Sequence, residues 1–188
     1  VEASDPLRYV RLSAKLTSHL LQCSADKKPV VVWNVAQRCN LKCIHCYSQS
    51  QDKEYPGELS TAEGRGLIED LARFGSPVIL FSGGEPLLRQ DLLLLAQVAT
   101  DRGMRAVIST NGTLITQKMA GELKRIGLSY VGVSLDGMQQ TNDRFRGVKG
   151  AFAAALRGIR NCQDAGIKVG LRFTINRRNA LDVPEIFN

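Results

Sequence analysis

The sequence predicts an α/β fold in which βα units repeat and their strands form a parallel sheet. Short runs rich in β-branched residues alternate with longer segments of helical periodicity, which is typical of such units. Polar segments that carry glycine follow the expected strands, and single glycines follow the expected helices. Units in series form either an open doubly wound sheet or part of a barrel, and the pattern alone does not decide between the two. At 188 residues, the chain has room for a single domain.

The β-branched runs predict five strands, which cover residues 30–35, 78–81, 105–109, 130–134 and 169–175. Between them, apolar side chains recur three or four residues apart and predict helices with one buried face. These side chains are Leu67, Ile68 and Leu71, then Met119, Leu123 and Ile126, then Phe152, Leu156 and Ile159.

The ends of the predicted helices carry typical start and stop residues. Glycines stand where a helix is expected to end and a turn to lead into the next strand, at Gly75, Gly103, Gly127 and Gly166. Ser60 and Glu63 fit a capping box at the start of the first helix. Gly64 and Gly66 weaken that helix by roughly 1 kcal/mol each relative to alanine, so its start is less well defined.

The composition excludes several classes of protein. Hydrophobic residues make up 44% and charged residues 23% of the chain, which is ordinary for a globular protein. The apolar runs are far shorter than the roughly 20 residues that a membrane-spanning helix needs. Residues 1–16 mix charges and offer no apolar core of a secretory signal, so we predict a cytoplasmic protein. The net charge of +7 favours an anionic partner, but the basic residues are scattered, which disfavours dedicated nucleic-acid binding.

Each predicted strand is followed by a polar segment. The cysteine-bearing loop follows the first strand, and Ser-Gly-Gly-Glu-Pro, Thr-Asn-Gly, Leu-Asp-Gly and Asn176 follow the others in turn. Ligands of parallel α/β proteins bind at the carboxyl ends of the strands. We therefore expect these five segments to meet at one edge of the sheet.

The cysteines predict a metal site and not a disulfide framework. Their number, 5, is odd, and three of them lie within eight residues, at Cys39, Cys43 and Cys46. Cys23 and Cys162 stand alone and are expected to be buried or bystander thiols.

The spacing Cys39-x3-Cys43-x2-Cys46 offers three thiolates and no nearby fourth cysteine. A structural zinc site needs four ligands, and the local fourth candidate is His45, which directly precedes a ligand and would strain the geometry. A four-iron cluster held by three cysteines leaves one iron open to a substrate or cofactor. That interpretation suits a catalytic sheet edge better than zinc, which remains the alternative.

The string Gly83-Gly84-Glu85-Pro86 follows the second strand. Two glycines permit positive φ angles and a close approach of the backbone to a ligand, and a carboxylate next to them can receive an ammonium group. Alone, the string is also compatible with a tight turn that ends in a solvated glutamate.

Together, these strings resemble the radical S-adenosylmethionine (radical SAM) enzymes, whose hallmark is C-x3-C-x2-C after the first barrel strand and GGEP after the second. The chain has CNLKCIHC at 39–46 and GGEP at 83–86, and the likeness continues through STNGTLI at 109–115, VSLDG at 133–137 and FRGVKGAF at 145–152. It covers most of residues 29–188.

The resemblance implies a partial (βα)6 TIM-like barrel. Residues 1–28 would form an N-terminal extension, and residues 29–188 would form the first five βα units of the core. Because relatives continue beyond this point, we expect the chain to be a fragment of a longer protein. Residues 181–188 are expected to begin a further helix.

The resemblance also implies two cofactors, a 4Fe-4S cluster bound by the three clustered cysteines, and S-adenosylmethionine bound at the open iron. Roles in binding the second cofactor are implied for His45, Gly83, Gly84, Glu85, Ser109, Asn111 and Ser134. Gly83, Gly84 and Glu85 would hold its amino group, and His45 would lie near its adenine. The serines could equally bond to local backbone. For Asp136 and Arg146, a structural salt bridge or a solvated side chain is expected.

The residues around the motifs resemble the branch that modifies tetrapyrroles in heme and heme d1 biosynthesis, as in VVWNVAQRCNLKCIHCYS and FSGGEPLLR. Such an enzyme cleaves S-adenosylmethionine reductively to a 5'-deoxyadenosyl radical, and it needs an electron donor of the flavodoxin or ferredoxin type. An anionic tetrapyrrole would suit the net charge. Peptide-modifying and PqqE-like maturases share the STNGT and SLDG phrases. The sequence is also compatible with a structural zinc module or with a nucleic-acid-modifying enzyme.

Overall fold

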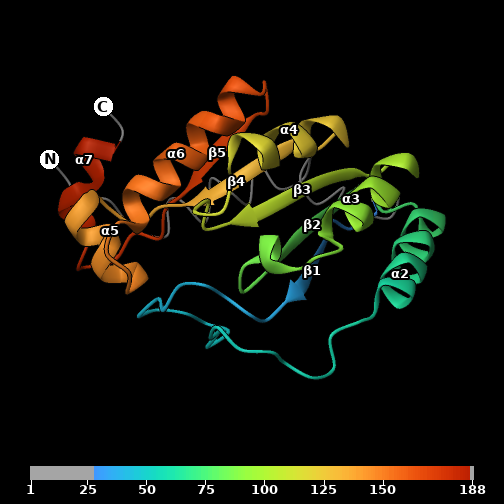
Figure 1. Cartoon of the computed structure of the whole chain (residues 1–188), viewed down its shortest axis with the longest axis horizontal. Coiled ribbons are helices and arrows are strands. Elements are labelled where there is room, and N and C mark those ends of the chain that lie inside the picture. The colour runs from blue at the N-terminus through green and yellow to red at the C-terminus, as the bar shows by residue number, and fades with distance from the viewer. Residues whose placement is uncertain (1–27, 187–188) are drawn as a thin grey trace, which may run out of the picture.

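A computed structural model describes residues 28–186 of the chain (Figure 1). The predicted N-terminal extension, apart from Lys28, lies outside the described residues, as does Cys23. The helix expected from residue 181 is described as far as Ile186, as the 3-10 turn Ala180–Asp182 followed by α7 (Val183–Ile186).

The sheet has five parallel strands in the sequential order β1-β2-β3-β4-β5. The strands are β1 (Val31–Ala36), β2 (Val78–Gly83), β3 (Arg105–Thr110), β4 (Tyr130–Ser134) and β5 (Val169–Arg172). In a doubly wound sheet the strand order reverses near the middle, whereas in a barrel each strand lies beside its predecessor. The order therefore decides for part of a barrel, as the family resemblance implied.

Helices connect the strands and lie on the same side of the sheet in Figure 1, as expected when every crossover is right-handed. They are α2 (Thr61–Phe74), α3 (Leu92–Asp101), α4 (Gln117–Arg125), α5 (Gln139–Arg146) and α6 (Ala151–Asp164). Strand residues that face the helices form the core, and Ile79, Phe81, Ile108, Val131 and Val133 are fully buried there. Residues on the opposite face of the sheet line the candidate functional site, which is described below.

The predicted helix ends are confirmed. Ser60 accepts a hydrogen bond from the Glu63 amide, and the Glu63 carboxylate accepts one from the Ser60 amide, which completes the capping box of α2. Gly75 ends this helix at φ 86°, in the left-handed region that a side chain disfavours. The three other predicted stop glycines also have positive φ angles.

Two helices are absent from the predictions, and two strand ends differ from them by more than one residue. Helix α3 lies outside the predictions because residues 92–95 are all leucine, so the sequence does not distinguish its buried face, which contains Leu92, Leu95 and Ala99, from Leu94, which is exposed. Helix α5 is polar and offers few apolar side chains to mark a buried face. Strand β5 ends at Arg172 instead of residue 175, because the Thr174 amide donates to the Asp136 carboxylate and not to a neighbouring strand. Strand β2 extends to Gly83, which pairs with β1.

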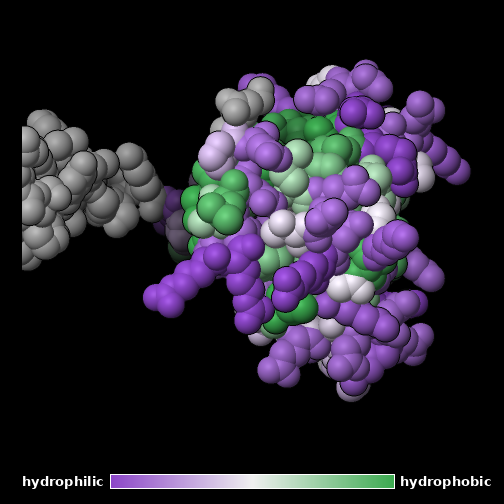
Figure 2. All heavy atoms as spheres, turned by 90° about the vertical axis from the view of Figure 1, so that its left-hand side faces the viewer, coloured by the Kyte–Doolittle hydropathy of each residue, from purple (hydrophilic) through white to green (hydrophobic). Residues whose placement is uncertain are grey.

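The segments that follow β4 and β5 lie at the left of Figure 1, with α5 and α7. Figure 2 faces this side and shows mostly hydrophilic residues, with hydrophobic ones in separate groups. Between residues 28 and 186, the structure contains no helix with the length and apolar character needed to span a bilayer.

Candidate functional site

A cavity of about 440 Å³ opens at the carboxyl edge of the sheet, and we call it the cysteine cavity. Its volume lies within the range of small-molecule sites, about 300 to 1,000 Å³. Nearly all of the residues predicted to bind cofactors line it: Cys39, Cys43, His45, Cys46, Gly83, Gly84, Ser109, Asn111 and Ser134. The structure thus brings together segments that follow four different strands.

The loop that carries the cysteines is fixed by backbone hydrogen bonds to distant segments. The Cys39 amide donates to Gln51, the Lys42 amide to Arg146 and the Ile44 amide to Phe145. The last two contacts join the loop to the end of α5. Because the partners lie in two different segments, the loop has a defined place against the sheet edge even though it contains no strand or helix of its own.

The three thiols have unlike surroundings. Burial raises the pKa of Cys39 to about 11. A hydrogen bond from the Leu41 amide lowers this pKa, whereas the negative charges of Glu85, Cys43 and Cys46 raise it further. Burial also opposes ionisation of Cys46, but hydrogen bonds from Ser48 and Ser50 outweigh it and lower its pKa. All three cysteines line the cysteine cavity in spite of these different surroundings.

Asp136 joins three elements beneath the cysteine loop. One of its oxygens lies 2.5 Å from Arg146 Nη2 and 3.2 Å from His45 Nε2, and the other accepts the Thr174 amide. The salt bridge that the sequence allowed is therefore formed, but it is buried and lines the cavity. Arg146 also donates to the Cys43 sulfur at 3.6 Å, a contact that no sequence pattern indicates.

The two glycines of the GGEP string are required by packing of the backbone. A Cβ on Gly83 would collide with the Ala36 carbonyl, and a Cβ on Gly84 would collide with those of Gln37 and Arg38. This close approach lets the Gly84 amide donate to Ala36 at 2.7 Å. The glycines therefore seat the end of β2 against the chain that enters the cysteine loop, and both still line the cavity.

Glu85 differs from the other predicted ligands because it does not line the cavity. It is fully buried and accepts hydrogen bonds from Thr110 Oγ1 at 2.8 Å, the Asn111 amide at 2.8 Å and the Leu87 amide at 3.1 Å. Burial raises its pKa in spite of these donors. The structure thus shows Glu85 linking the ends of β2 and β3, and its predicted contact with an ammonium group stays a prediction.

The remaining polar residues of the cavity differ in whether their side chains already make hydrogen bonds. Asn111 donates to Asn40 Oδ1 at 2.9 Å and accepts the Thr113 amide, so its amide group organises the turn after β3. Ser109 and Ser134 line the cavity, and within residues 28–186 their hydroxyls make no hydrogen bond. The bonds to local backbone that the sequence also allowed for these serines are not formed there.

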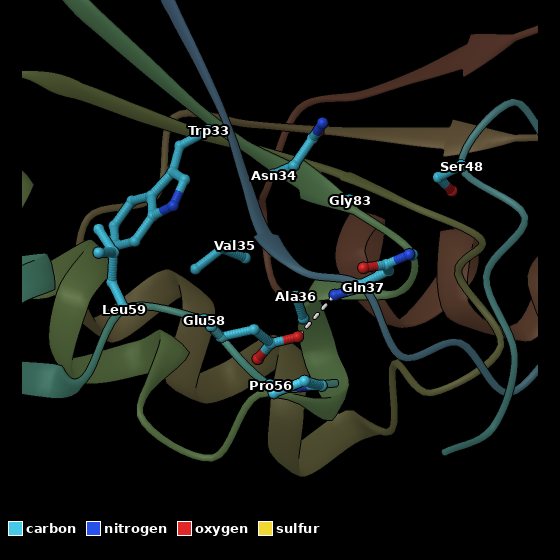
Figure 3. A pocket seen from close by; sticks show the side chains of 12 residues that line it. Trp33, Asn34, Val35, Ala36, Gln37, Ser48, Pro56, Glu58, Leu59 and Gly83 are labelled. Carbon is cyan, nitrogen blue, oxygen red and sulfur yellow. Dashed lines mark hydrogen bonds between the residues drawn. The ribbon is translucent and has the colours of Figure 1, made fainter. Parts of the chain in front are cut away.

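A second, smaller pocket of about 290 Å³ lies beside the end of β1 (Figure 3). Trp33, Val35 and Leu59 supply its apolar wall, and Glu58 accepts the Gln37 amide at 2.8 Å. It contains no cysteine and shares the two glycines of the GGEP string with the cysteine cavity. The thiols and the polar residues at the strand ends therefore line the cysteine cavity and not this pocket.

The number and surroundings of the three thiols indicate whether they suit an iron–sulfur cluster or a zinc ion. A closed structural zinc site needs four ligands, whereas a four-iron cluster can be held by three cysteines. The lining of the cysteine cavity contains three cysteines, and this set of thiolates fits the cluster.

The family profile described as "Radical SAM superfamily" matches residues 33–188. The chain belongs to the radical SAM superfamily. The cofactors of this superfamily are a 4Fe-4S cluster and S-adenosylmethionine, so both predicted cofactors are confirmed. The ligand roles of individual residues remain predictions.

Two relatives are named for tetrapyrrole chemistry. The Fe-coproporphyrin III synthase of Methanosarcina barkeri is 69% identical over the whole of this chain, which covers 47% of that protein. The pre-heme d1 synthase of Dinoroseobacter shibae is 52% identical over 85% of this chain and 39% of its own length. This radical SAM chain therefore spans about half of the curated relatives it matches or less, and both names fall within the branch predicted from the sequence.

The fold recurs in a solved radical SAM structure, that of Streptococcus suis SuiB bound to S-adenosylmethionine. It superposes with a TM-score of 0.74 over the whole of this chain and 44% of the SuiB chain, at 16% identity. At that identity the likeness shows the fold alone, and it agrees with the parallel α/β architecture of the sheet.

Proposed function

We propose that the complete protein is a radical SAM oxidoreductase that modifies a side chain of a tetrapyrrole in heme or heme d1 biosynthesis. The observation that carries this proposal is the cysteine cavity, in which three thiols, the GGEP glycines and polar strand ends meet. The names of the two relatives supply the substrate class. When bound, the cluster would supply the electron that cleaves S-adenosylmethionine to a 5'-deoxyadenosyl radical.

The residues of the chain would divide the work of binding and positioning. Cys39, Cys43 and Cys46 would hold the cluster, and the backbone at Gly83 and Gly84 would hold the amino group of S-adenosylmethionine. Arg146 would stabilise a thiolate at Cys43, because its guanidinium already donates to that sulfur. Thiolate ligands are stabilised by such cationic donors.

Two further features follow from this chemistry. The reaction needs an electron from outside, and we propose a flavodoxin or ferredoxin as the donor. Free thiols that must remain reduced are typical of the cytoplasm, where we place the protein. His45 would contact the adenine, and its partial exposure at the cavity and its edge-on packing against Phe145 support this role.

The test is an iron and sulfide count on anaerobically prepared protein, with the electron paramagnetic resonance spectrum of the reduced form recorded before and after addition of S-adenosylmethionine. We expect about four irons and a spectrum that changes on addition. Cys43→Ala should lose the iron, whereas Cys162→Ala, at a buried thiol of α6, should retain it. Zinc without iron would support a structural zinc module instead.

Substrate class is tested in the same preparation by the yield of 5'-deoxyadenosine under reducing conditions. A tetrapyrrole with carboxylate side chains should increase that yield above the level seen without substrate. An increase with a peptide and none with a tetrapyrrole would favour a peptide maturase.

A further inference from the structure

Arg172 is the one cationic side chain of the cysteine cavity that has no partner within residues 28–186. The other arginine of the lining, Arg146, is held by Asp136 and Cys43. Arg172 is exposed at the end of β5, and its guanidinium forms no hydrogen bond or ion pair with any described residue. A guanidinium that lines a cavity without a counter-charge favours an anionic ligand there.

The sheet makes room for this side chain. Ser134 pairs with Arg172 in the parallel register of β4 and β5, and Gly132 lies two residues earlier on the same face of β4. A Cβ on Gly132 would collide with Arg172 Nε and would lie 3.2 Å from Cδ and Cζ. The arginine therefore lies flat across β4, in a place that any larger residue at position 132 would occupy.

The opposite glycine repeats the arrangement. Gly170 pairs with Gly132, and a Cβ on Gly170 would collide with the hydroxyl of Tyr130. The two strands thus accommodate each other's long side chains on the face of the sheet that is turned away from the helices. The two neighbouring glycines are therefore covered by Arg172 and Tyr130, which fixes the place of the arginine side chain on this face.

Hydroxyl groups near Arg172 complete a set of donors. Ser109, Ser134 and Thr174 line the same cavity, and the hydroxyls of both serines have no hydrogen-bond partner among the described residues. An arginine fork binds a carboxylate through two parallel hydrogen bonds, and hydroxyls can satisfy its remaining lone pairs. The one acidic side chain of the lining, Asp136, is already paired with Arg146.

We infer that Arg172 binds a carboxylate side chain of the substrate and so fixes the substrate's orientation in the cavity. This inference rests on the proposed tetrapyrrole substrate. The carboxylate of S-adenosylmethionine is the competing anion. The resemblance assigns that group to the open iron, and the spectral response to S-adenosylmethionine in the test below separates it from the substrate. Arg172 lies on the last strand of the sheet, whereas the cysteines follow the first.

The test compares the binding of coproporphyrin III, which carries four carboxylates, with that of its tetramethyl ester, followed by absorbance titration of the full chain with its cluster. We expect Arg172→Gln to weaken binding of the free acid by about tenfold or more and to leave binding of the ester unchanged. Arg172→Lys should restore part of the affinity. Arg105→Gln, which removes the same charge from an exposed position at the start of β3, should bind like the wild type.

Three outcomes would overturn the inference. Equal binding of the free acid by the wild type and Arg172→Gln would show that this arginine does not contact the substrate. Loss of the spectral response to S-adenosylmethionine in Arg172→Gln would assign the arginine to the cofactor. A wild type that responds to S-adenosylmethionine but binds neither porphyrin would overturn the tetrapyrrole substrate as well, which separates the failure of the proposed function from that of Arg172 alone.

Discussion

Glu85 links the ends of two strands through its buried carboxylate. Its carboxylate accepts three hydrogen bonds, from Leu87 in the turn after β2, from Thr110 at the end of β3 and from Asn111 directly after it. The burial that raises its pKa acts against these donors. The folded chain therefore binds a proton at Glu85 more tightly than the unfolded chain does, and this has a consequence for stability.

We expect the contribution of Glu85 to stability to fall as pH rises. Above its ordinary pKa of 4.5 the unfolded chain loses this proton, while the folded chain retains it until the higher folded pKa is passed. Proton linkage then lowers the free energy of unfolding across that window. Urea unfolding of the wild type and Glu85→Gln at pH 4, 6 and 8 measures the effect, and the difference between them should shrink with pH.

Glu63 provides a control with the opposite sign. Hydrogen bonds from Ser60 lower its pKa, so its contribution is present above the ordinary value and is lost as pH falls through the lowered one. The difference between the wild type and Glu63→Gln should therefore grow from pH 4 to pH 6. If the Glu85 difference grows in the same way, its hydrogen bonds outweigh its burial and our assignment of the direction is wrong.

At the scale of the elements, regular periodicity and turn chemistry were predictable from the sequence, and contacts between distant segments were not. The capping box of α2 and the stop at Gly75 need only local residues, and both are confirmed. The contact of Arg146 with Cys43 joins residues 103 positions apart, so no local pattern contains it. Helix α3 could not be assigned from periodicity because four consecutive leucines obscure its one buried face, and Leu94 among them is exposed.

In the candidate site too, local sequence patterns were predictable and contacts between distant segments were not. The cysteines and the two glycines of GGEP were predicted to meet at one sheet edge because parallel strands end there, and they line one cavity. The absence of Glu85 from that lining could not be predicted. Glu85 lies past the end of β2, so the alternation of side chains along a strand no longer determines which way it points. The direction of its side chain depends on the hydrogen-bond donors that β3 and the turn after it offer.

Helix α2 offers a prediction in which two glycines, equivalent in the sequence, differ in the structure. A Cβ on Gly64 would lie 2.8 Å from Trp33 and 3.1 Å from Leu95, whereas a Cβ on Gly66 would meet nothing within 4 Å. We expect Gly66→Ala to raise the free energy of unfolding by about 1 kcal/mol through helix propensity. Gly64→Ala should lower it by about 1 to 3 kcal/mol through overpacking.

Urea unfolding of the two variants and the wild type under one set of conditions measures both effects. Because each variant adds the same methyl group to the same helix, propensity cancels in the comparison between them. Equal shifts for the two variants would mean that Trp33 moves aside at no cost, and that α2 does not pack closely on β1.

At the scale of the whole molecule, the cysteine loop is a junction between segments that the sheet keeps apart. It donates to α5 through Lys42 and Ile44, and the chain leading into it accepts the amides of Gly84 and Glu85 through Ala36 and Arg38. Any group that orders the loop should therefore also stabilise the ends of β2 and α5. Among the described residues, helix α4 makes no backbone hydrogen bond to this loop.

Amide hydrogen exchange before and after anaerobic loading with iron and sulfide tests this coupling. We expect slower exchange in residues 39–46 and also at Glu85 and Asn111, whose amides are bonded to the loop entrance and to the Glu85 carboxylate. Helix α4, which makes none of these bonds, should be unchanged and serves as the internal control. Protection confined to residues 39–46 would show that the loop is ordered independently of the sheet edge. Slower exchange throughout α4 would instead indicate global stabilisation, because ligand binding then raises every opening free energy alike.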